Sequence, residues 1–382
     1  MTYLASKPRY EILDGLRGVA AVMVVLFHIL ETYSSGPAYQ IINHGYLAVD
    51  FFFILSGFVI GYAYDDRWDK MTISGFFKRR LVRLHPMVIM GTVIGACLYF
   101  FGQGEGFSLI GNVPGWKVLL AFIMGCLMIP CGPKMDIRGW VETNSFNGPN
   151  WSLTYEYLAN ILYALIFRKL PNIILMLLIC ISAFCTLDLC LNWNVFNLLS
   201  EDRSAQIYTV IGGWSITSEQ IYIGLTRLFY PFLCGLLISR VGRFIRIKRA
   251  FLWCSLMLII VFSIPCIGGE GNILNGIYNA LSILFIFPLI VMAGAGGEIK
   301  SERSARLCNF LGEISYPLYM THFPLLYVQM NWAWSHPDAP LYAHIAVAAG
   351  CIVLSIGLAY ACLKLYDIPV RKWLTDKYLK KS

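Results

Sequence analysis

Arg17 and His28 are the residues whose types and spacing most directly suggest chemistry. They lie eleven residues apart within the first hydrophobic segment, residues 12–32. Eleven helical residues turn through three full turns plus about 20°, so both side chains share one face, about 16 Å apart along the axis. An ionisable residue inside a membrane helix costs about 2.5–3.5 kcal/mol, which favours a functional role. We expect a long ligand with a charged head group to lie along this helix.

Three further ionisable residues, Asp50, Glu156 and His322, fall inside other hydrophobic segments. A rise of about 1.5 Å per residue, counted from the segment ends, places them level with His28 in the outer half of a membrane. A carboxylate beside a histidine fixes its tautomer and stabilises the imidazolium, the usual arrangement for general base catalysis. The depths predict a reaction chamber with His28 as general base and either Glu156 or Asp50 as its carboxylate.

Structural roles are the alternative for each of these residues. A histidine in a membrane helix often makes a hydrogen bond between helices. Asp14 precedes Arg17 by three residues and could neutralise it on the same helix face, and Asp50 could pair with Arg227 at similar depth. The residues alone leave these alternatives open.

A basic run at residues 78–83 contains Arg80 and Arg83, three residues apart and therefore on one helix face. Arginine binds phosphate through bidentate hydrogen bonds, so this run suits a phosphorylated ligand. The alternative is ordinary anchoring at the cytoplasmic surface of a membrane.

The elements that must position these residues are membrane helices. The chain has 382 residues, of which 58% are hydrophobic and 14% charged, a composition typical of a polytopic membrane protein. We predict an all-α fold with about ten membrane spans, at residues 12–32, 45–64, 84–102, 151–167, 172–191, 221–239, 250–267, 273–294, 309–331 and 341–366. A further apolar stretch, 118–129, is too short to cross about 30 Å of hydrocarbon, so we expect a re-entrant or interfacial segment.

The basic residues predict the orientation of these spans. Five of the 30 Lys and Arg residues fall in outer segments, and most of the others fall in segments that would all face the cytoplasm. This bias places both termini in the cytoplasm. We expect one membrane domain, residues 1–382, with no appended soluble domain. The twelve cysteines show no metal-type spacing, so we expect no metal site.

Five ordered motifs resemble the integral-membrane acyltransferase-3 family, which transfers acyl groups to sugars of cell-surface glycans. The first is the segment 13–21 with Arg17 ten intervening residues before His28. The second, segment 45–58, has Ala48 where glycine is more usual in the family. The others are Arg80-x-x-Arg83-x-x-Pro86, residues 150–156 and residues 312–322. The ten membrane helices of the family agree with the number predicted here from charge and length.

The resemblance implies a membrane-bound O-acyltransferase that takes an acyl group, most often acetyl, from cytoplasmic acyl-coenzyme A. No tightly bound cofactor is implied. Arg80 and Arg83 would hold the phosphorylated head group, Arg17 would line the tunnel, and Ser56 would hydrogen-bond the donor. His28 would act as general base on a sugar hydroxyl, or would itself carry the acyl group.

On the acceptor side, Trp151 and Tyr155 would stack on a sugar, and His322 would bind substrate. The resemblance implies a glycan or lipid-linked sugar as acceptor, membrane lipids as surroundings, no nucleic acid, and a place in the plasma membrane of a bacterium. A competing hypothesis is a transporter or flippase of an anionic glycolipid that uses the same buried charges.

Overall fold

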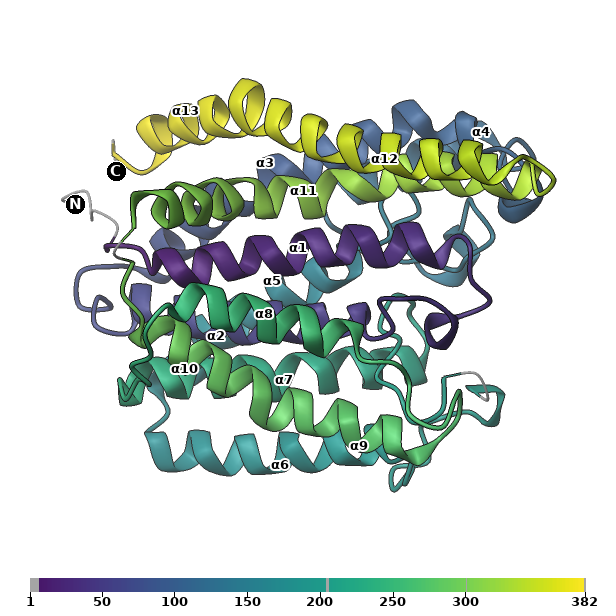
Figure 1. Cartoon of the computed structure of the whole chain (residues 1–382). Helices are drawn as coiled ribbons and strands as arrows, with labels where there is room; N and C mark the ends of the chain where they lie inside the picture. Colours follow the sequence, from purple (N-terminus) through teal and green to yellow (C-terminus); the bar gives the residue numbers. More distant parts are fainter. Residues whose placement is uncertain (1–6, 204–205, 300, 381–382) are drawn as a thin grey trace.

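The structure is a computed structural model that describes residues 7–203, 206–299 and 301–380, and all regular structure in these ranges is helical (Figure 1). The predicted all-α fold is therefore confirmed. The α-helices are α1 Glu11–Glu31, α2 Ala48–Tyr64, α3 Ile73–Leu98, α4 Gly115–Cys126, α5 Asn150–Leu165, α6 Asn172–Cys190, α7 Ser218–Val241, α8 Ala250–Ser263, α9 Ile273–Leu281, α10 Phe287–Gly296, α11 Glu302–Ser335, α12 Leu341–Cys362 and α13 Ile368–Tyr378.

Seven helical segments of the described chain are long and apolar enough to cross a membrane, so the protein is an integral membrane protein. Three of the ten predicted spans do not meet that standard. Helices α5 and α8 have 16 and 14 residues and are short for about 30 Å of hydrocarbon. Helix α11 has 34 residues, and charged residues occur in its first half. The ten-span count stays a prediction. The seven segments are Glu11–Glu31, Gly45–Tyr64, Ile73–Gly102, Asn172–Cys190, Ser218–Val241, Ile273–Gly296 and Leu341–Tyr378.

The helices run back and forth between two ends of the bundle, and the start of α1 and the end of α13 lie at the same one, on the left in Figure 1. We call this the basic end. Its loops are joined by ion pairs, with Lys7 Nζ 2.7 Å from Asp66 and Arg240 Nε 2.6 Å from Asp65. Arg240 also donates to the carbonyl oxygen of Phe167 at 3.0 Å. That α1 begins and α13 ends at the basic end agrees with the predicted orientation, in which both termini lie on one side. The assignment of this end to the cytoplasm stays a prediction.

Helices α1 and α11 lie against each other along much of their lengths in the middle of the bundle. Gly18 of α1 makes the close approach possible, since a Cβ atom there would overlap the carbonyl group of Leu311 in α11. A second close crossing joins α2 to α7, where a Cβ atom on Gly57 would overlap the carbonyl oxygen of Phe232. Small residues let membrane helices pack by backbone contact. This packing fixes the face of α1 that carries Arg17 and His28 against α11.

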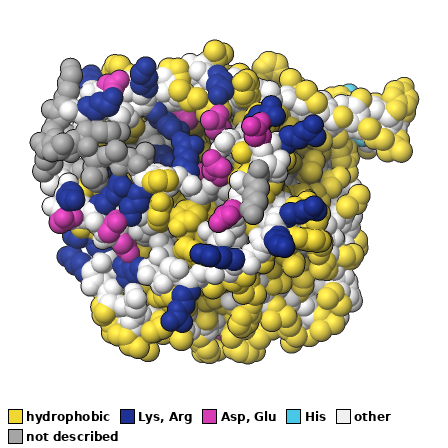
Figure 2. All heavy atoms as spheres, turned by 60° about the vertical axis from the view of Figure 1, so that its left-hand side comes forward, with side chains coloured by type: hydrophobic (Ala, Val, Ile, Leu, Met, Phe, Trp, Pro, Cys, Tyr) yellow, Lys and Arg dark blue, Asp and Glu magenta, His cyan; other side chains and the backbone are white. Residues whose placement is uncertain are grey.

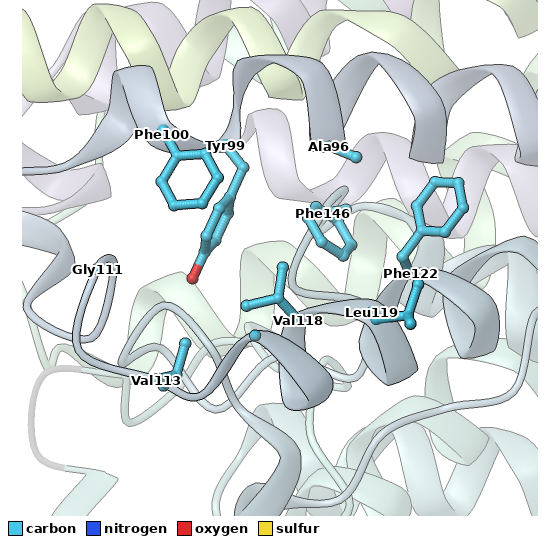
Figure 3. A pocket seen from close by; sticks show the side chains of 10 residues that line it. Ala96, Tyr99, Phe100, Gly111, Val113, Val118, Leu119, Phe122 and Phe146 are labelled. Carbon is cyan, nitrogen blue, oxygen red and sulfur yellow. The ribbon is translucent and has the colours of Figure 1, made fainter.

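Helix α4 corresponds to the short apolar stretch noted in the sequence. Its 12 residues span about 18 Å, too little to cross the hydrocarbon of a bilayer. A pocket of about 500 Å³ separates it from the end of α3 (Figure 3). The pocket is lined by Ala96, Tyr99, Phe100, Gly111, Val113, Gly115, Val118, Leu119, Phe122 and Phe146. The short helix is confirmed, and its re-entrant or interfacial position stays a prediction.

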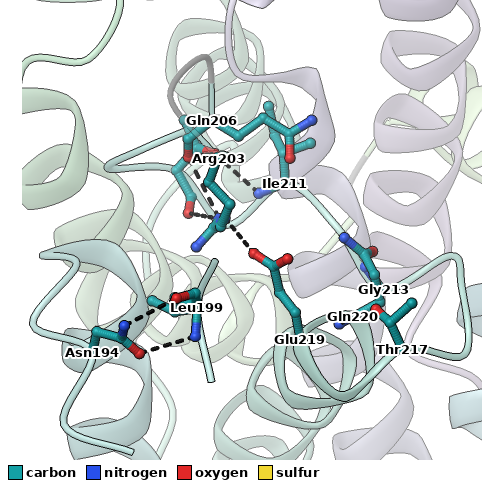
Figure 4. A network of polar contacts seen from close by, with 10 residues as sticks. Asn194, Leu199, Arg203, Gln206, Ile211, Gly213, Thr217, Glu219 and Gln220 are labelled. Carbon is teal, nitrogen blue, oxygen red and sulfur yellow. Dashed lines mark hydrogen bonds and ion pairs between the residues drawn. The ribbon is translucent and has the colours of Figure 1, made fainter. Parts of the chain in front are cut away.

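The connection between α6 and α7, at the end opposite the basic end, is held by its own polar groups (Figure 4). Arg203 lies 3.1 Å from Glu219, and the side-chain oxygen of Gln220 accepts from the backbone of Gly213 at 2.6 Å. The side chain of Asn194 both donates to and accepts from the backbone of Leu199. These contacts hold the connection together and attach it to the first turn of α7.

Candidate functional site

His28 lies in the last turn of α1 and is held by a carboxylate from its own helix. Its Nδ1 atom is 2.8 Å from Oε2 of Glu31, three residues further on. The His322 ring of α11 is stacked on it, with ring centroids 6.0 Å apart and planes at 28°. Phe323 meets the edge of the His28 ring at 5.0 Å. The structure thus brings together two of the four residues expected at one level, His28 and His322.

Hydrogen bonds fix the tautomer of His322. Its Nδ1 atom lies 3.0 Å and 2.9 Å from the carbonyl oxygens of Leu318 and Tyr319. A carbonyl can only accept, so Nδ1 carries the proton and Nε2 carries the lone pair. The side chain is fully buried, and Nε2 has no hydrogen-bond partner among the described residues.

The Glu31 carboxylate orients the ring of His28. When its Nδ1–H group donates to the Glu31 carboxylate, the lone pair of the neutral ring is on Nε2. A carboxylate in this position orients the imidazole and stabilises the cation that forms when Nε2 takes a proton. The pair therefore offers two unprotonated Nε2 atoms in one place, one of them backed by a carboxylate.

A second group of predicted residues meets nearer the basic end. Oε1 of Glu156 accepts from Arg80 Nη2 at 2.8 Å and from the Ser56 hydroxyl at 2.7 Å. These three residues come from α5, α3 and α2. The Arg80 and Ser56 side chains therefore lie beside each other, and their expected role in binding the donor stays a prediction.

Arg17 forms the ion pair that the sequence left as an alternative. Its Nη2 atom is 2.8 Å from Asp14, and its Nε donates to the Ser315 hydroxyl at 2.9 Å. The side chain keeps 23% of its surface exposed. Pairing with Asp14 thus orients the guanidinium without removing it from solvent.

Arg83 is exposed, and no described residue forms a hydrogen bond or ion pair with it. Its electrostatic neighbours include Arg17, Arg80 and Arg371, and the acids Asp14 and Asp367. We call Arg17, Arg80, Arg83 and Arg371 the arginine cluster. Lys and Arg side chains also gather over the surface of the basic end (Figure 2). An excess of positive charge with an unpaired guanidinium suits a polyanionic ligand.

Asp50 is fully buried and paired with Arg227 of α7, whose Nη2 lies 2.7 Å from the carboxylate. Glu156 is engaged with Arg80 as described above. Neither carboxylate forms a hydrogen bond or ion pair with His28. Asp50 thus forms the ion pair with Arg227 that the sequence offered as an alternative. The catalytic roles expected of Asp50 and Glu156 stay predictions.

Trp151 and Tyr155 pack into the core between α5 and α7. The Arg227 guanidinium lies 5.3 Å from the Trp151 ring, and the rings of Trp151 and Tyr155 are 5.9 Å apart. Gly224 of α7 abuts the Tyr155 ring. No ring contact joins either residue to the two histidines, so sugar stacking by them stays a prediction.

Glu31 is the residue that the sequence reasoning missed. It lies at the end of the first hydrophobic segment and follows His28 by three residues, a spacing at which helical side chains meet. That spacing was the available signal.

The acyltransferase domain family matches residues 10–364, nearly the whole chain. "Protein 2 in picA locus" of Rhizobium radiobacter is 35% identical over 164 residues, which cover 41% of this chain and 81% of that protein. The O-acetyltransferase OatA of Staphylococcus aureus is 23% identical over 96% of this chain and 58% of OatA. A putative O-acetyltransferase of S. aureus strain COL is 24% identical over 94% of this chain and 57% of that protein.

The chain thus spans less than three fifths of the length of these two staphylococcal relatives. No solved structure matches it. The match to the family covers α1 with Arg17 and His28, the arginines of α3 and the His322 turn of α11. The chain therefore belongs to the acyltransferase-3 family, as an integral membrane protein built on its acyltransferase domain.

Proposed function

We propose that this protein transfers an acetyl group from cytoplasmic acetyl-coenzyme A to a hydroxyl group of a cell-surface or lipid-linked glycan. The acceptor would be at the outer side of a bacterial plasma membrane. The observation that carries the proposal is the His28–Glu31 pair, with the His28 ring stacked beside that of His322. Family membership supports acyl transfer as the reaction, and the name of OatA supports an acetyl group and an oxygen acceptor.

The arginine cluster supports coenzyme A as the donor. Coenzyme A has a phosphate-rich head group and a long arm that ends in the thioester. The head group would meet Arg83, Arg80 and Arg371, with Arg17 at the start of the arm. Arg17 and His28 share one face of α1 about 16 Å apart, so an arm along that face would bring the thioester to His28.

In the proposed reaction, His28 Nε2 takes the proton of the acceptor hydroxyl as its oxygen attacks the thioester carbonyl carbon. The carbon–sulfur bond then breaks, and the thiolate leaves as the free thiol with the proton held by His28. Glu31 stabilises the imidazolium between these two transfers. The His322 ring is 6.0 Å from that of His28, and its Nε2 atom would accept a hydrogen bond from the acceptor, in line with its expected role in substrate binding.

This reaction requires that the basic end faces the cytoplasm, where acetyl-coenzyme A is found. We propose that both termini are cytoplasmic and that residues 1–382 form one membrane domain. The excess of Lys and Arg at that end supports this orientation.

The proposal is tested with the purified full chain, labelled acetyl-coenzyme A and a glycan acceptor. The wild-type protein should move label to the acceptor, and the His28→Ala variant should not, while both fold alike by gel filtration in detergent. Label found on the wild-type protein without acceptor would identify His28 as the acyl carrier. Equal transfer by the two proteins would refute the proposed mechanism, and movement of unacetylated glycolipid across vesicles would favour the transporter hypothesis.

A further inference from the structure

We infer that residues 136–150, the amide segment, bind the acceptor and select a neutral, polyhydroxylated ring. The inference rests on the proposed function and names the part of the chain that would recognise its acceptor. The amide segment connects α4 to α5 and begins α5 with Asn150.

The amide segment is unusual because it is both polar and buried. Charged, amide and hydroxyl side chains follow one another in it, and each is at most 7% exposed. A loop normally lies on the surface, where water satisfies its polar groups. This one is inserted between helices, since a Cβ atom on Gly95 of α3 would overlap the Phe146 carbonyl oxygen. The buried polar residues are Asp136, Arg138, Glu142, Thr143, Asn144, Ser145, Asn147 and Asn150.

Asn147 ties the amide segment to the turn of α11 that carries His322. Pro324 has no N–H group, so the carbonyl oxygen of Met320 lacks its usual helical donor. The side-chain amide of Asn147 supplies that donor at 2.8 Å. Two residues after Met320 comes His322, so this hydrogen bond holds the segment beside the histidine pair.

A second connection joins the amide segment to His28 through Tyr327 and Phe323. Tyr327 donates to the Glu142 carboxylate at 2.6 Å and accepts from the backbone of Gly148 at 3.2 Å. The Tyr327 ring is 4.8 Å from that of Phe323, which in turn is 5.0 Å from the His28 ring. The Phe323 ring thus lies between Tyr327, which holds the amide segment, and His28, the proposed general base.

Several polar atoms of the segment have no hydrogen-bond partner among the described residues. They include both side-chain atoms of Asn150, Oδ1 of Asn144 and the Ser145 hydroxyl. Buried polar groups are almost always hydrogen-bonded in native proteins, so these atoms require a partner from outside the described chain. Amides and hydroxyls both donate and accept without charge, which matches the hydroxyl groups of a neutral sugar.

The charged residues of the segment make most of their contacts within the protein. Arg138 donates to the Ser145 carbonyl oxygen and lies 3.7 Å from the centre of the Tyr327 ring. Asp136 accepts from three backbone N–H groups of residues 138–141. Apart from Nη1 of Arg138, which has no hydrogen-bond partner among the described residues, the unpartnered groups are uncharged. The Asp136 and Glu142 carboxylates of the segment offset the one guanidinium, which favours a neutral ring over an anionic one.

The test compares two acceptors with the purified full chain and labelled acetyl-coenzyme A. Methyl β-D-glucopyranoside presents a ring of hydroxyls, and butan-1-ol presents one hydroxyl without a ring. The measured quantity is the ratio of kcat/KM for the glycoside to that for butanol. Loss of one neutral hydrogen bond is worth about 2- to 12-fold, so Asn150→Ala and Asn144→Ala should each lower the ratio by that factor.

Asn279→Ala is the matched control, since Asn279 of α9 is also fully buried with an unpartnered Oδ1 atom. It should leave the ratio unchanged. If Asn150→Ala does not elute as a single species from gel filtration, Asn150→Ser provides the comparison, because serine keeps a donor and an acceptor of different reach. A ratio within twofold of wild type in the Asn150 and Asn144 variants would overturn the inference and assign the amides to bound water. A wild-type chain that releases no coenzyme A with either acceptor would contradict the proposed function, and the inference with it.

Discussion

Replacement of Glu31 by glutamine tests the pair on which the proposed reaction depends. The change removes one charge and keeps the size of the side chain, so packing is preserved. Opposite charges about 4 Å apart interact by about 4 kcal/mol at an effective dielectric constant of 20. The side chains of His28 and Glu31 are 23% and 37% exposed, and solvent screening reduces this value to about 2 kcal/mol. We expect the Glu31→Gln variant to lose about 30-fold in kcat.

The assay follows release of free coenzyme A with a thiol reagent, at saturating acetyl-coenzyme A and acceptor. The donor KM should change little, because the arginine cluster is untouched. Glu313→Gln is the matched control, since Glu313 forms an exposed ion pair with Lys364 at 3.2 Å and has no contact with the histidines. A Glu31→Gln variant with kcat within twofold of wild type would refute the assignment of Glu31 as the partner of His28.

The remaining predictions concern the donor site and the buried charges. Arg83→Ala should raise the donor KM at least tenfold, since a charge-assisted hydrogen bond is worth about 1.5–3 kcal/mol, and leave the acceptor KM unchanged; an unaltered donor KM would contradict the head-group site. Arg227→Ala leaves Asp50 buried without its partner and should lower the free energy of unfolding by about 3–5 kcal/mol, seen as a large drop in Tm in detergent, and an unchanged Tm would contradict the stabilising role of this pair. Burial raises the pKa of Glu142, in the amide segment, to about 7 from 4.5. The folded state therefore favours its protonated form, and stability should fall as pH rises from about 4.5 to 7, by up to about 3 kcal/mol. Glu142→Gln should remove this fall, so Tm measured at pH 5 and pH 8 should differ less in the variant than in wild type, and equal differences would contradict the raised pKa.

The sequence was most informative where a single helix carries the chemistry. The spacing of Arg17 and His28 predicted a shared face of one helix, and both lie in α1. The spacing of Arg80 and Arg83 predicted one cationic face, and Arg80 and Arg17 are both electrostatic neighbours of Arg83 in the structure. In these cases the helical period alone relates the residues, so the fold around them does not have to be known.

Residue depths, counted from the ends of the hydrophobic segments, were less informative where several helices meet. They place residues at one level along the membrane normal but give no rotation of one helix about another. His28 and His322 meet because α1 and α11 approach closely at Gly18, whereas Asp50 turns toward Arg227 of α7. The amide segment has no helical period at all, and its burial depends on the fit of Phe146 against Gly95 and on the carbonyl left free by Pro324.

Proteoliposomes provide the most direct test of the central claim, that His28 passes an acetyl group from a donor bound at the basic end to an acceptor at the other end. The wild-type chain is reconstituted with a glycan acceptor trapped inside, and labelled acetyl-coenzyme A is added outside. Molecules whose basic end faces outward should label the trapped acceptor, and vesicles with the His28→Ala variant should not. Label on the trapped acceptor in both preparations, or in neither, would contradict the account.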